Sequence, residues 1–382
     1  MRINSNYSLC TVGGAKYLLP YAQGICDHKR GVKLNATGVV IWEAIVRGLS
    51  GDALLEHVAE YYEASEEEVA IIKEDIDAFL IQLTSMDIII EDEIGVRVMN
   101  VPKHYIQIGP ISLEIFCFDN VFPDEFKPFE CPRPVTVDYN INTVMGAPAS
   151  HVFGEAIIRN SELNVYDSQE FFTLEFPTFS TISECRIYKT VDRSDLYYSG
   201  MDAFAVKTEL FHAIRHIFLY TAARRGCFAL HSSSILYDDK AWLFSGPSGT
   251  GKSTHTNLWK KLYDAPIING DLNLMGIEDN QPVIYGMPWC GTSGICSTEK
   301  HELGGVILLQ QSPTNKCIEL LSDARSLLTL NRLVSPMWTK GQQNRCVDFT
   351  NEITKKILVC KLECNMEDEA AETMKNFIDK NS

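Results

Sequence analysis

The sequence lacks the features that mark membrane, secreted and zinc-stapled proteins. No apolar run approaches the roughly 18 residues that cross a bilayer, so a membrane role has no support. The chain begins Met-Arg-Ile-Asn-Ser-Asn-Tyr, without a charged-then-apolar signal segment. Its 12 cysteines include no C-x-x-C pair, so a structural metal is not expected. We therefore expect a cytoplasmic globular protein with reduced thiols.

Positive charge is also scarce. Lys and Arg number 34 against 50 Asp and Glu, which gives a net charge of −16. Because such a surface repels phosphate backbones, nucleic acid is not an expected partner. With 382 residues, of which 45% are hydrophobic, the chain can bury a full core and has room for two or three domains. The sequence leaves open whether the protein forms a homo-oligomer.

A phosphate-loop pattern, G-x-x-x-x-G-K-[ST], runs from Gly246 to Ser253. An apolar strand at 241–245 precedes it and an amphipathic helix at 254–262 follows. The glycines let backbone N–H groups converge on phosphate oxygens, and the helix N-terminus adds its positive dipole end. Lys252 would then reach the β- and γ-phosphates, and the Ser253 hydroxyl a Mg²⁺ ion. The expected nucleotide-binding residues are Gly246, Pro247, Ser248, Gly249, Thr250, Gly251, Lys252, Ser253 and Thr254.

The first 95 residues look like a separate domain. Alternating segments around a Gly13-Gly14 turn predict a hairpin, and a third short strand is expected at 31–34. Asn35 is the expected cap of the first helix, and Ser65 with Glu68 forms a capping box for the third. The remaining predicted elements are helices at 37–47, 52–62 and 65–83 and a closing strand at 86–90. Strands with three short helices predict a winged-helix-like module.

Charge decides what this module binds. Residues 1–92 hold 15 Asp/Glu and 7 Lys/Arg, a net of −8, and the third helix is itself acidic. A helix with that charge cannot enter a DNA groove. The exposed edge of the small sheet favours a peptide bound by strand addition. The alternative, that the acidic run is the solvated face of a structural cap, stays open.

The stretch Leu34-Asn-Ala-Thr-Gly-Val-Val-Ile-Trp42, with the acidic helices after it, resembles the PqqD family. Members of that family are small domains that recognise the leaders of ribosomally made, modified peptides (RiPPs). The resemblance implies that a leader lies along the third strand and against the third helix. Residues near 31–34 and 66–80 would flank it.

Beyond the module, residues 96–382 are expected to form one domain. Alternating segments broken by Pro, Asp and Asn indicate a β-rich part up to about residue 200. A helix is predicted at 203–225, ended by Gly226, and a strand at 228–237 leads into the phosphate-loop strand. The downstream chain predicts a strand near 305–310, helices near 319–334 and ending near 355, a strand at 357–364 and a final acidic helix.

Asp271 is the candidate acid of an ATP-using site. It ends the segment Pro266-Ile-Ile-Asn-Gly-Asp271, only 19 positions after Lys252. That spacing leaves room for one helix and one strand. It therefore favours a subclass of phosphate-loop proteins in which the acid lies on the strand that comes directly after the phosphate-loop helix.

This region resembles HPr kinase/phosphorylase and its kinase relatives, which share a phosphate-loop core with phosphoenolpyruvate carboxykinases. The matching pieces are a Leu230-His231-Ser232 strand, the hairpin into the phosphate loop and the strand ending Gly270-Asp271. The resemblance implies that Asp271 is the general base for an attacking hydroxyl and that His231 lies beside the phosphates. The fold class implied for the whole chain is α+β and α/β, a PqqD-like module followed by an HPr kinase-like domain.

The chain departs from that family at three places. Gly270-Asp271 stands where two adjacent aspartates are common, so Asp271 would serve as both base and metal ligand. Thr254 replaces an acidic residue after the phosphate-loop Ser. The Arg- and Pro-rich segment of the phosphorylase reaction is missing, so neither reverse phosphorolysis nor HPr as substrate is expected.

Further candidates follow Asp271 in the chain. The Gly/Pro-rich segment 285–294 is near enough in chain order to border an acceptor cleft, although a plain surface turn fits almost as well. Cys290 within it has no identifiable activating neighbour, and a phosphate-loop enzyme needs no covalent intermediate. Three arginines are candidate phosphate stabilisers that the sequence cannot rank: Arg325, Arg332 and Arg345.

The sequence therefore predicts a Ser/Thr peptide kinase that uses ATP and Mg²⁺. The module at 1–95 would capture the leader of a RiPP precursor peptide, and the domain at 96–382 would phosphorylate a hydroxyl in its core, in natural product biosynthesis. Two alternatives stay open. One is a kinase for a free small molecule such as serine, and the other is a non-catalytic nucleotide-binding scaffold that presents a peptide.

Overall fold

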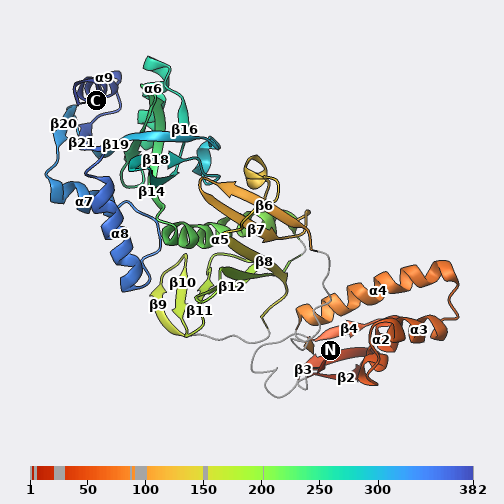
Figure 1. Ribbon diagram of the computed structural model, residues 1–382. Coiled ribbons are helices and arrows are strands. Elements are labelled where there is room, and N and C mark those ends of the chain that lie inside the picture. Colours follow the sequence, from red (N-terminus) through yellow and green to blue (C-terminus); the bar gives the residue numbers. More distant parts are fainter. Residues whose placement is uncertain are drawn as a thin grey trace.

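The computed structural model describes residues 2–3, 7–20, 31–86, 88–90, 101–148, 154–200 and 202–381. Helices and strands are both abundant, so the mixed α and β fold class is confirmed. Figure 1 shows the N-terminal elements in red and orange and the rest of the chain in yellow to blue. The predicted boundary between residues 95 and 96 lies outside the described residues.

The N-terminal module has the predicted winged-helix-like content. Strands β2, β3 and β4 form an antiparallel sheet in that order, and β1 pairs with β5. The Asn35 side chain caps α2 by accepting the Gly38 N–H at 2.7 Å, and Ser65 with Glu68 forms the predicted capping box of α4. The elements are β1 (Arg2–Ile3), β2 (Tyr7–Val12), β3 (Ala15–Pro20), β4 (Val32–Leu34), α2 (Ala36–Val46), α3 (Asp52–Tyr61), α4 (Glu66–Ser85) and β5 (Ile89–Ile90).

The closing strand is shorter than its sequence predicted. Met86 ends α4 as its C-cap instead of opening a strand, and only Ile89–Ile90 pair, with Arg2–Ile3. Ile88 and Ile89 lie in the module core, so burial holds this segment together with the short pairing. Asp87 of the predicted strand lies outside the described residues.

The second part of the chain begins with an eight-stranded sheet in the order β6-β7-β8-β13-β12-β11-β10-β9. Neighbouring strands are antiparallel except β7 with β8 and β8 with β13, which are parallel. The strands and one short helix are β6 (Lys103–Ile108), β7 (Ile111–Phe116), η1 (Asp124–Phe129), β8 (Tyr139–Met145), β9 (Glu155–Arg159), β10 (Asn164–Asp167), β11 (Phe171–Glu175), β12 (Ile182–Tyr188) and β13 (Arg193–Tyr198).

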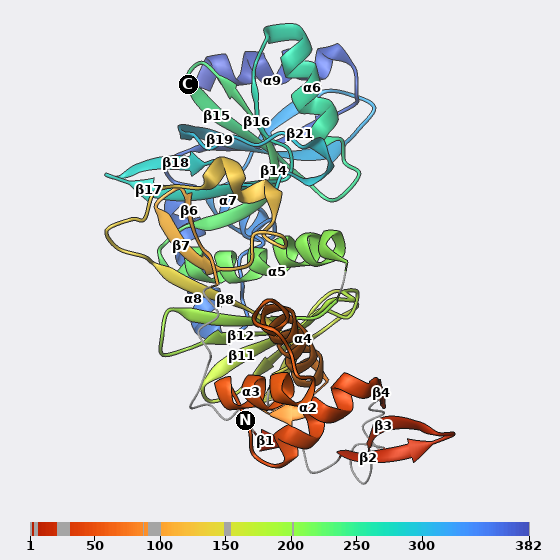
Figure 2. The same ribbon diagram turned by 90° about the vertical axis from the view of Figure 1, so that its right-hand side faces the viewer.

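Helix α5 (Ala203–Arg224) joins this sheet to the phosphate-loop region, as Figure 2 shows. Leu210, Ile214 and Ile217 of α5 share one core cluster with Leu113 of the first sheet. The same cluster includes Leu274, which belongs to the second sheet. One continuous core therefore links both sheets across α5.

The second sheet holds the phosphate loop. Its order is β15-β14-β17-β18-β19-β21-β20, and because β15 also pairs with β19, the strands from β15 to β19 close into a ring. Strand β16 pairs with β14 beside this path. The strands are β14 (Phe228–Tyr237), β15 (Lys240–Ser245), β16 (Ile267–Asn269), β17 (Leu272–Glu278), β18 (Gln281–Tyr285), β19 (Lys300–Gln311), β20 (Lys316–Glu319) and β21 (Leu358–Cys364).

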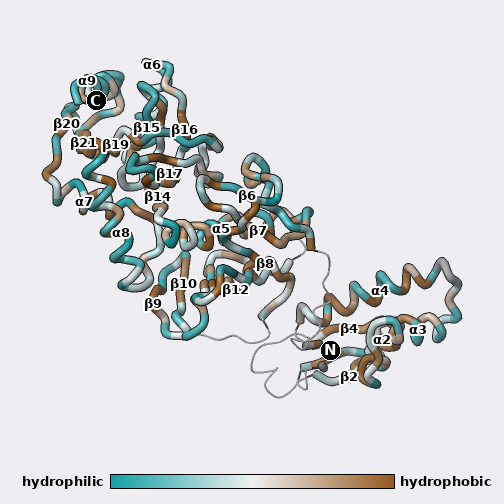
Figure 3. The backbone as a smooth tube through the Cα atoms, viewed as in Figure 1, coloured by the Kyte–Doolittle hydropathy of each residue, from teal (hydrophilic) through white to brown (hydrophobic). Residues whose placement is uncertain are grey.

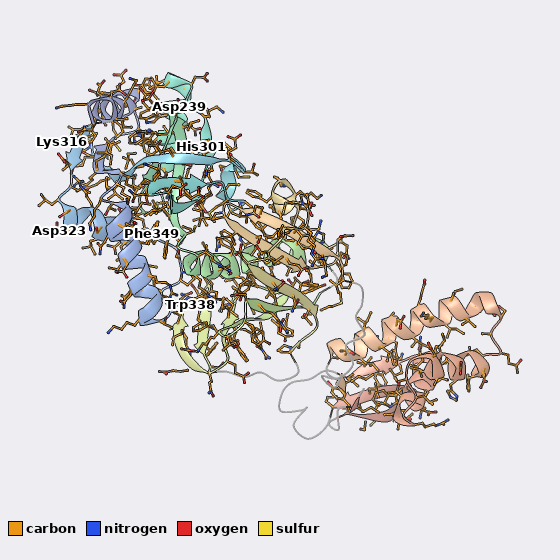
Figure 4. All side chains as sticks on the ribbon, in the orientation of Figure 1. Asp239, His301, Lys316, Asp323, Trp338 and Phe349 are labelled. Carbon is orange, nitrogen blue, oxygen red and sulfur yellow. The ribbon has the colours of Figure 1, made fainter. Side chains whose placement is uncertain are left out.

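Helices pack on this sheet through two separate clusters of apolar side chains. Leu258 and Trp259 of α6 and Met374 of α9 pack together in one of them. Phe349 of α8, labelled in Figure 4, packs with Phe228 in the other. Figure 3 shows brown, apolar residues concentrated along the strands of the two large sheets. The remaining helices are α6 (Lys252–Tyr263), η2 (Gly291–Ser293), α7 (Ser322–Leu330), α8 (Lys340–Ile353) and α9 (Asp368–Asn381).

The module has a core of its own, which gives a test of its independence. Leu54 is fully buried there, among described residues that all lie between 3 and 89. Leu54→Ala is expected to lower the free energy of unfolding of the module by about 2–5 kcal/mol through the cavity it leaves. Differential scanning calorimetry should show only the module transition shifting, and Ile71→Ala, at a side chain 61% exposed, should change little. A shift of both transitions by Leu54→Ala would contradict separate cores.

Candidate functional site

The phosphate loop connects β15 directly to α6, and its glycines are required by its shape. Gly249 and Gly251 have φ angles of +78° and +94°, the left-handed region that side chains with a Cβ rarely adopt. A Cβ on Gly246 would lie 2.6 Å from Thr250 Oγ1 and 3.2 Å from the Leu309 carbonyl oxygen. The loop can therefore wrap closely around an anion at the start of α6.

Lys252 lies over this loop. Its Nζ donates to the carbonyl oxygens of Gly246 at 3.2 Å and Pro247 at 3.4 Å. Burial lowers the pKa of the Lys252 ammonium, and the charge of Arg332 lowers it further, while Asp271 acts in the opposite direction. The ammonium and the helix N-terminus together make this end of the loop strongly attractive to phosphate.

Asp271 and His231 meet across neighbouring strands. Antiparallel pairing of β14 with β17 sets His231 opposite Leu272. Asp271, the residue before Leu272, therefore lies beside the imidazole of His231. His231 Nε2 and Asp271 Oδ1 are 3.2 Å apart, and each side chain is 33% exposed. The hydrogen bond from His231 lowers the pKa of Asp271, burial opposes this, and the charges of Arg215 and Lys252 lower it further. The structure thus brings together the predicted acid and the predicted histidine.

Asn269 holds Asp271 in place, and sequence reasoning missed it. Its buried Oδ1 accepts the N–H of Asp271 at 2.9 Å and of Leu272 at 3.1 Å, while its Nδ2 donates to the Met287 carbonyl at 2.9 Å. Asparagine favours such local turns because its side chain replaces a backbone acceptor. The signal in the sequence was the Asn-Gly-Asp order at the end of an apolar strand.

The segment 285–294 borders Asp271, as its chain position suggested. A Cβ on Gly291 would lie 3.0 Å from Asp271 Cβ, and a Cβ on Gly270 would lie 2.0 Å from Ser293 Oγ. Position 270 therefore has no room for the second aspartate that relatives of the predicted family carry. Burial, with Cys296 nearby, raises the pKa of Cys290 to about 11, so this thiol is protonated at neutral pH.

A cavity of about 390 Å³ adjoins the phosphate loop. Its volume lies near the lower end of the range typical of small-molecule sites. Loop residues form one wall, the end of β19 another, and two cations, Arg332 and Lys361, face it. The lining residues are Ser245, Gly246, Pro247, Thr250, Leu308, Leu309, Gln310, Gln311, Leu328, Arg332 and Lys361.

The structure separates the three candidate arginines. Arg332 lines the cavity, and its charge acts on Lys252. Arg325 instead bonds Glu319 at 3.0 Å and the Leu320 carbonyl at 2.7 Å. Arg345 lies on α8, where its charge acts on Tyr220. Arg332 is therefore the candidate that stands beside the loop.

Two oxygens at the site suit a Mg²⁺ ion. Among the described residues, neither Ser253 Oγ nor Asp271 Oδ2 has a protein hydrogen-bond partner. Mg²⁺ commonly takes one or two protein oxygens and completes its shell with phosphate oxygens and water. The described residues contain no group of three or more His, Cys, Asp or Glu that could hold a metal. The donor set thus fits an ion held jointly with a nucleotide.

The module offers a second candidate site at the edge of its sheet. Strand β4 pairs with β3 through Leu18 and Val32, and no described strand pairs with its other edge. An unpaired edge presents backbone N–H and C=O groups to an added strand. Residues 31–34, predicted to flank a leader, form this edge.

Comparison with known proteins supports the interpretation of the module. Residues 25–89 match the family model described as coenzyme PQQ synthesis protein D (PqqD), which confirms the resemblance of the N-terminal region. No curated protein matches the chain. Among solved structures, the chain is similar to the Hpr(Ser) kinase/phosphatase from Coxiella burnetii at 12% identity and a TM-score of 0.23, over 40% of this chain and 97% of that one.

A match with so low a TM-score does not support any interpretation of the second part of the chain. The kinase-like interpretation of that part depends on the geometry of Lys252, Asp271 and His231 described above. Within the described ranges, no helix combines the length and apolar character needed to cross a bilayer.

The hydrogen bond between His231 and Asp271 predicts a shift in the pKa of Asp271 that NMR can measure. His231→Gln is expected to raise the pKa of Asp271, because the hydrogen bond from His231 is the largest cause of its lowering. In the native protein the pKa of Asp271 in the folded state lies below its ordinary value of 3.8. The stabilisation of the fold by the ionised Asp271 carboxylate is therefore present above pH 3.8 and is lost as the pH falls through the folded-state pKa.

Carboxyl ¹³C titration of Asp271 in the native protein and in the variant measures this difference. His57→Gln, a histidine substitution in the module, is the matched control and should leave the titration unchanged. An equal Asp271 pKa in His231→Gln and the native protein would contradict the pairing.

Proposed function

We propose that this protein is an ATP-dependent kinase that phosphorylates a Ser or Thr hydroxyl of a ribosomally made precursor peptide. The observation that supports it is the placement of an ionised Asp271, paired with His231, within electrostatic range of Lys252 at the phosphate loop. A loop for the donor phosphates and a carboxylate for the acceptor proton are the two parts that phosphoryl transfer requires.

The phosphate loop would bind the donor. Backbone N–H groups from Gly246 to Thr254 would surround the phosphate oxygens, with Lys252 at the β- and γ-phosphates and Arg332 facing the adjoining cavity. Ser253 and Asp271 would hold Mg²⁺. When bound, this ion neutralises charge on the phosphate oxygens.

Asp271 would orient and deprotonate the acceptor. The hydroxyl oxygen forms a bond to the γ-phosphorus, the bond from that phosphorus to the bridging oxygen breaks, the proton passes to the Asp271 carboxylate, and ADP leaves. His231 and Asn269 fix the carboxylate, and its lowered pKa keeps it ionised. The low pKa suits orientation and late proton acceptance more than early deprotonation.

The module would supply the peptide. A leader added to the free edge of β4 would raise the local concentration of the attached core, so that the active site need bind only a short segment. The free cysteines among the described residues, many of them buried, suit a reducing compartment such as the cytoplasm.

Asp271→Asn is expected to lower kcat for peptide phosphorylation about 10²- to 10⁴-fold, because the amide cannot accept the hydroxyl proton. Affinity for a nonhydrolysable ATP analogue measured without Mg²⁺ should change little, whereas Lys252→Ala should weaken it. Asp348→Asn, at an exposed position of α8, and Lys260→Ala, at an exposed position of α6, are the matched controls. Unchanged peptide modification in both Asp271→Asn and Lys252→Ala would establish the scaffold alternative instead.

Removal of residues 1–95 is expected to raise KM for the full precursor peptide about 10²- to 10⁴-fold through loss of the tether. The separate core of the module implies that the remainder still folds. The KM and kcat for a core peptide without its leader should stay the same in both forms, as steady-state kinetics can show. Equal KM values of the full-length and truncated proteins for the full precursor would favour the small-molecule kinase. Rapid phosphorylation of free serine would favour it as well.

A further inference from the structure

Arg215 is a cation near Asp271 that sequence reasoning missed. It lies on α5, partly buried, and the described residues offer it no hydrogen bond or ion pair. Burial lowers the pKa of its guanidinium, while the charges of Asp271 and Glu162 oppose this. A guanidinium drawn out of water without a partner costs free energy. Such a group is suited to a partner that arrives with a ligand.

The helix face that carries Arg215 points it toward the segment 285–294. Phe211 and Phe218 lie one turn to either side of it. Trp289 stacks on Phe211 and makes a tilted contact with Phe218, with ring centroids 5.6 and 5.2 Å away. Trp289 Nε1 also donates to the Phe211 carbonyl at 3.1 Å. Two residues further on, Gly291 packs against Asp271. Arg215 therefore emerges where this segment borders the predicted base.

The other two cations of the site belong to the phosphate loop and its cavity. Lys252 and Arg332 act on each other at the phosphate loop and its cavity. Arg215 and Lys252 both act on Asp271. The phosphate loop and its cavity thus have two cations of their own, whereas Arg215 comes from α5, which Trp289 joins to the segment beside Asp271.

The histidines beside Arg215 do not share its charge. His212 and His216 flank it on α5, and burial lowers the pKa of both, that of His216 to about 3. Both rings are neutral at pH 7. Arg215 is therefore the permanent positive charge of this helix face near the base.

We propose that Arg215 binds a carboxylate of the acceptor peptide, next to the hydroxyl that receives the phosphoryl group. A guanidinium matches a carboxylate with two parallel N–H···O bonds, which fixes orientation as well as adding affinity. The carboxylate comes either from an acidic side chain beside the acceptor residue or from the end of the peptide chain. This inference rests on the proposed function, since it names the acceptor of the same site.

The test uses the full-length protein with Mg²⁺ and a nonhydrolysable ATP analogue. The probes are acetyl-Ala-Ser-Asp-amide, acetyl-Ala-Ser-Ala with a free carboxylate, and acetyl-Ala-Ser-Asn-amide as the neutral reference, each titrated by NMR. At least one acidic probe should bind about 10- to 100-fold more tightly than the reference, the size expected for a charge-assisted pair. The acidic probe with the larger gain in affinity over the reference shows whether the carboxylate comes from a side chain or from the end of the peptide chain.

Arg215→Gln should abolish that preference, and Arg215→Lys should keep part of it. Arg224→Gln, a change of the same kind at the far end of α5, should preserve it. Affinity for the ATP analogue should stay constant in all variants. Equal binding of acidic and neutral probes by the native protein overturns the proposal, and so does a loss of nucleotide affinity in Arg215→Gln with the peptide preference intact.

A uniform loss of all three probes in Arg215→Gln, not rescued by Arg215→Lys, would assign Arg215 a structural role and also overturn the proposal. Because these measurements record binding, they are separate from phosphoryl transfer. A native protein that prefers the acidic probe but transfers no phosphate would refute the proposed kinase activity and leave the carboxylate site standing.

Discussion

The hydrogen bond between His231 and Asp271 depends on a strand register, and the proposed chemistry depends on that bond. Pairing of β14 with β17 sets His231 opposite Leu272. Asn269 then turns the chain so that Asp271 projects beside the imidazole. A shift of one residue in this register would send the side chain to the other face of the sheet. The pairing of β14 with β15 on one side and with β17 on the other therefore decides whether an acid stands beside the phosphate loop.

Close packing explains why one aspartate stands where two are common in the family that this region resembles. The backbone at Gly270 and Gly291 approaches its neighbours too closely for a Cβ, so the segment 285–294 covers Asp271 from one side. That cover brings Trp289 onto α5 and leaves Arg215 beside the carboxylate. The segment 285–294 occupies the space that a second carboxylate would need. Asp271 would then have to serve as base and metal ligand together.

Local features were predicted from sequence better than distant ones. The Asn35 cap, the Ser65–Glu68 capping box and the glycines of the phosphate loop involve neighbours in the chain, and the structure contains each of them. The parallel pairing of β8 with β13 and the approach of Arg215 to Asp271 join residues more than 50 positions apart. No spacing rule in the sequence encodes such contacts, because they depend on how whole sheets pack. The domain boundary near residue 95 stays a prediction.

The central claim is that a leader-bound peptide receives the γ-phosphoryl group at a site formed by Lys252 and Asp271. Its most direct test is mass spectrometry of small peptides encoded beside the gene, after incubation with the full-length protein, ATP and Mg²⁺. We expect one leader-bearing peptide to gain the mass of a single phosphate on a Ser or Thr of its core. Consumption of ATP without a phosphorylated peptide, or peptide modification that needs no ATP, would contradict the account.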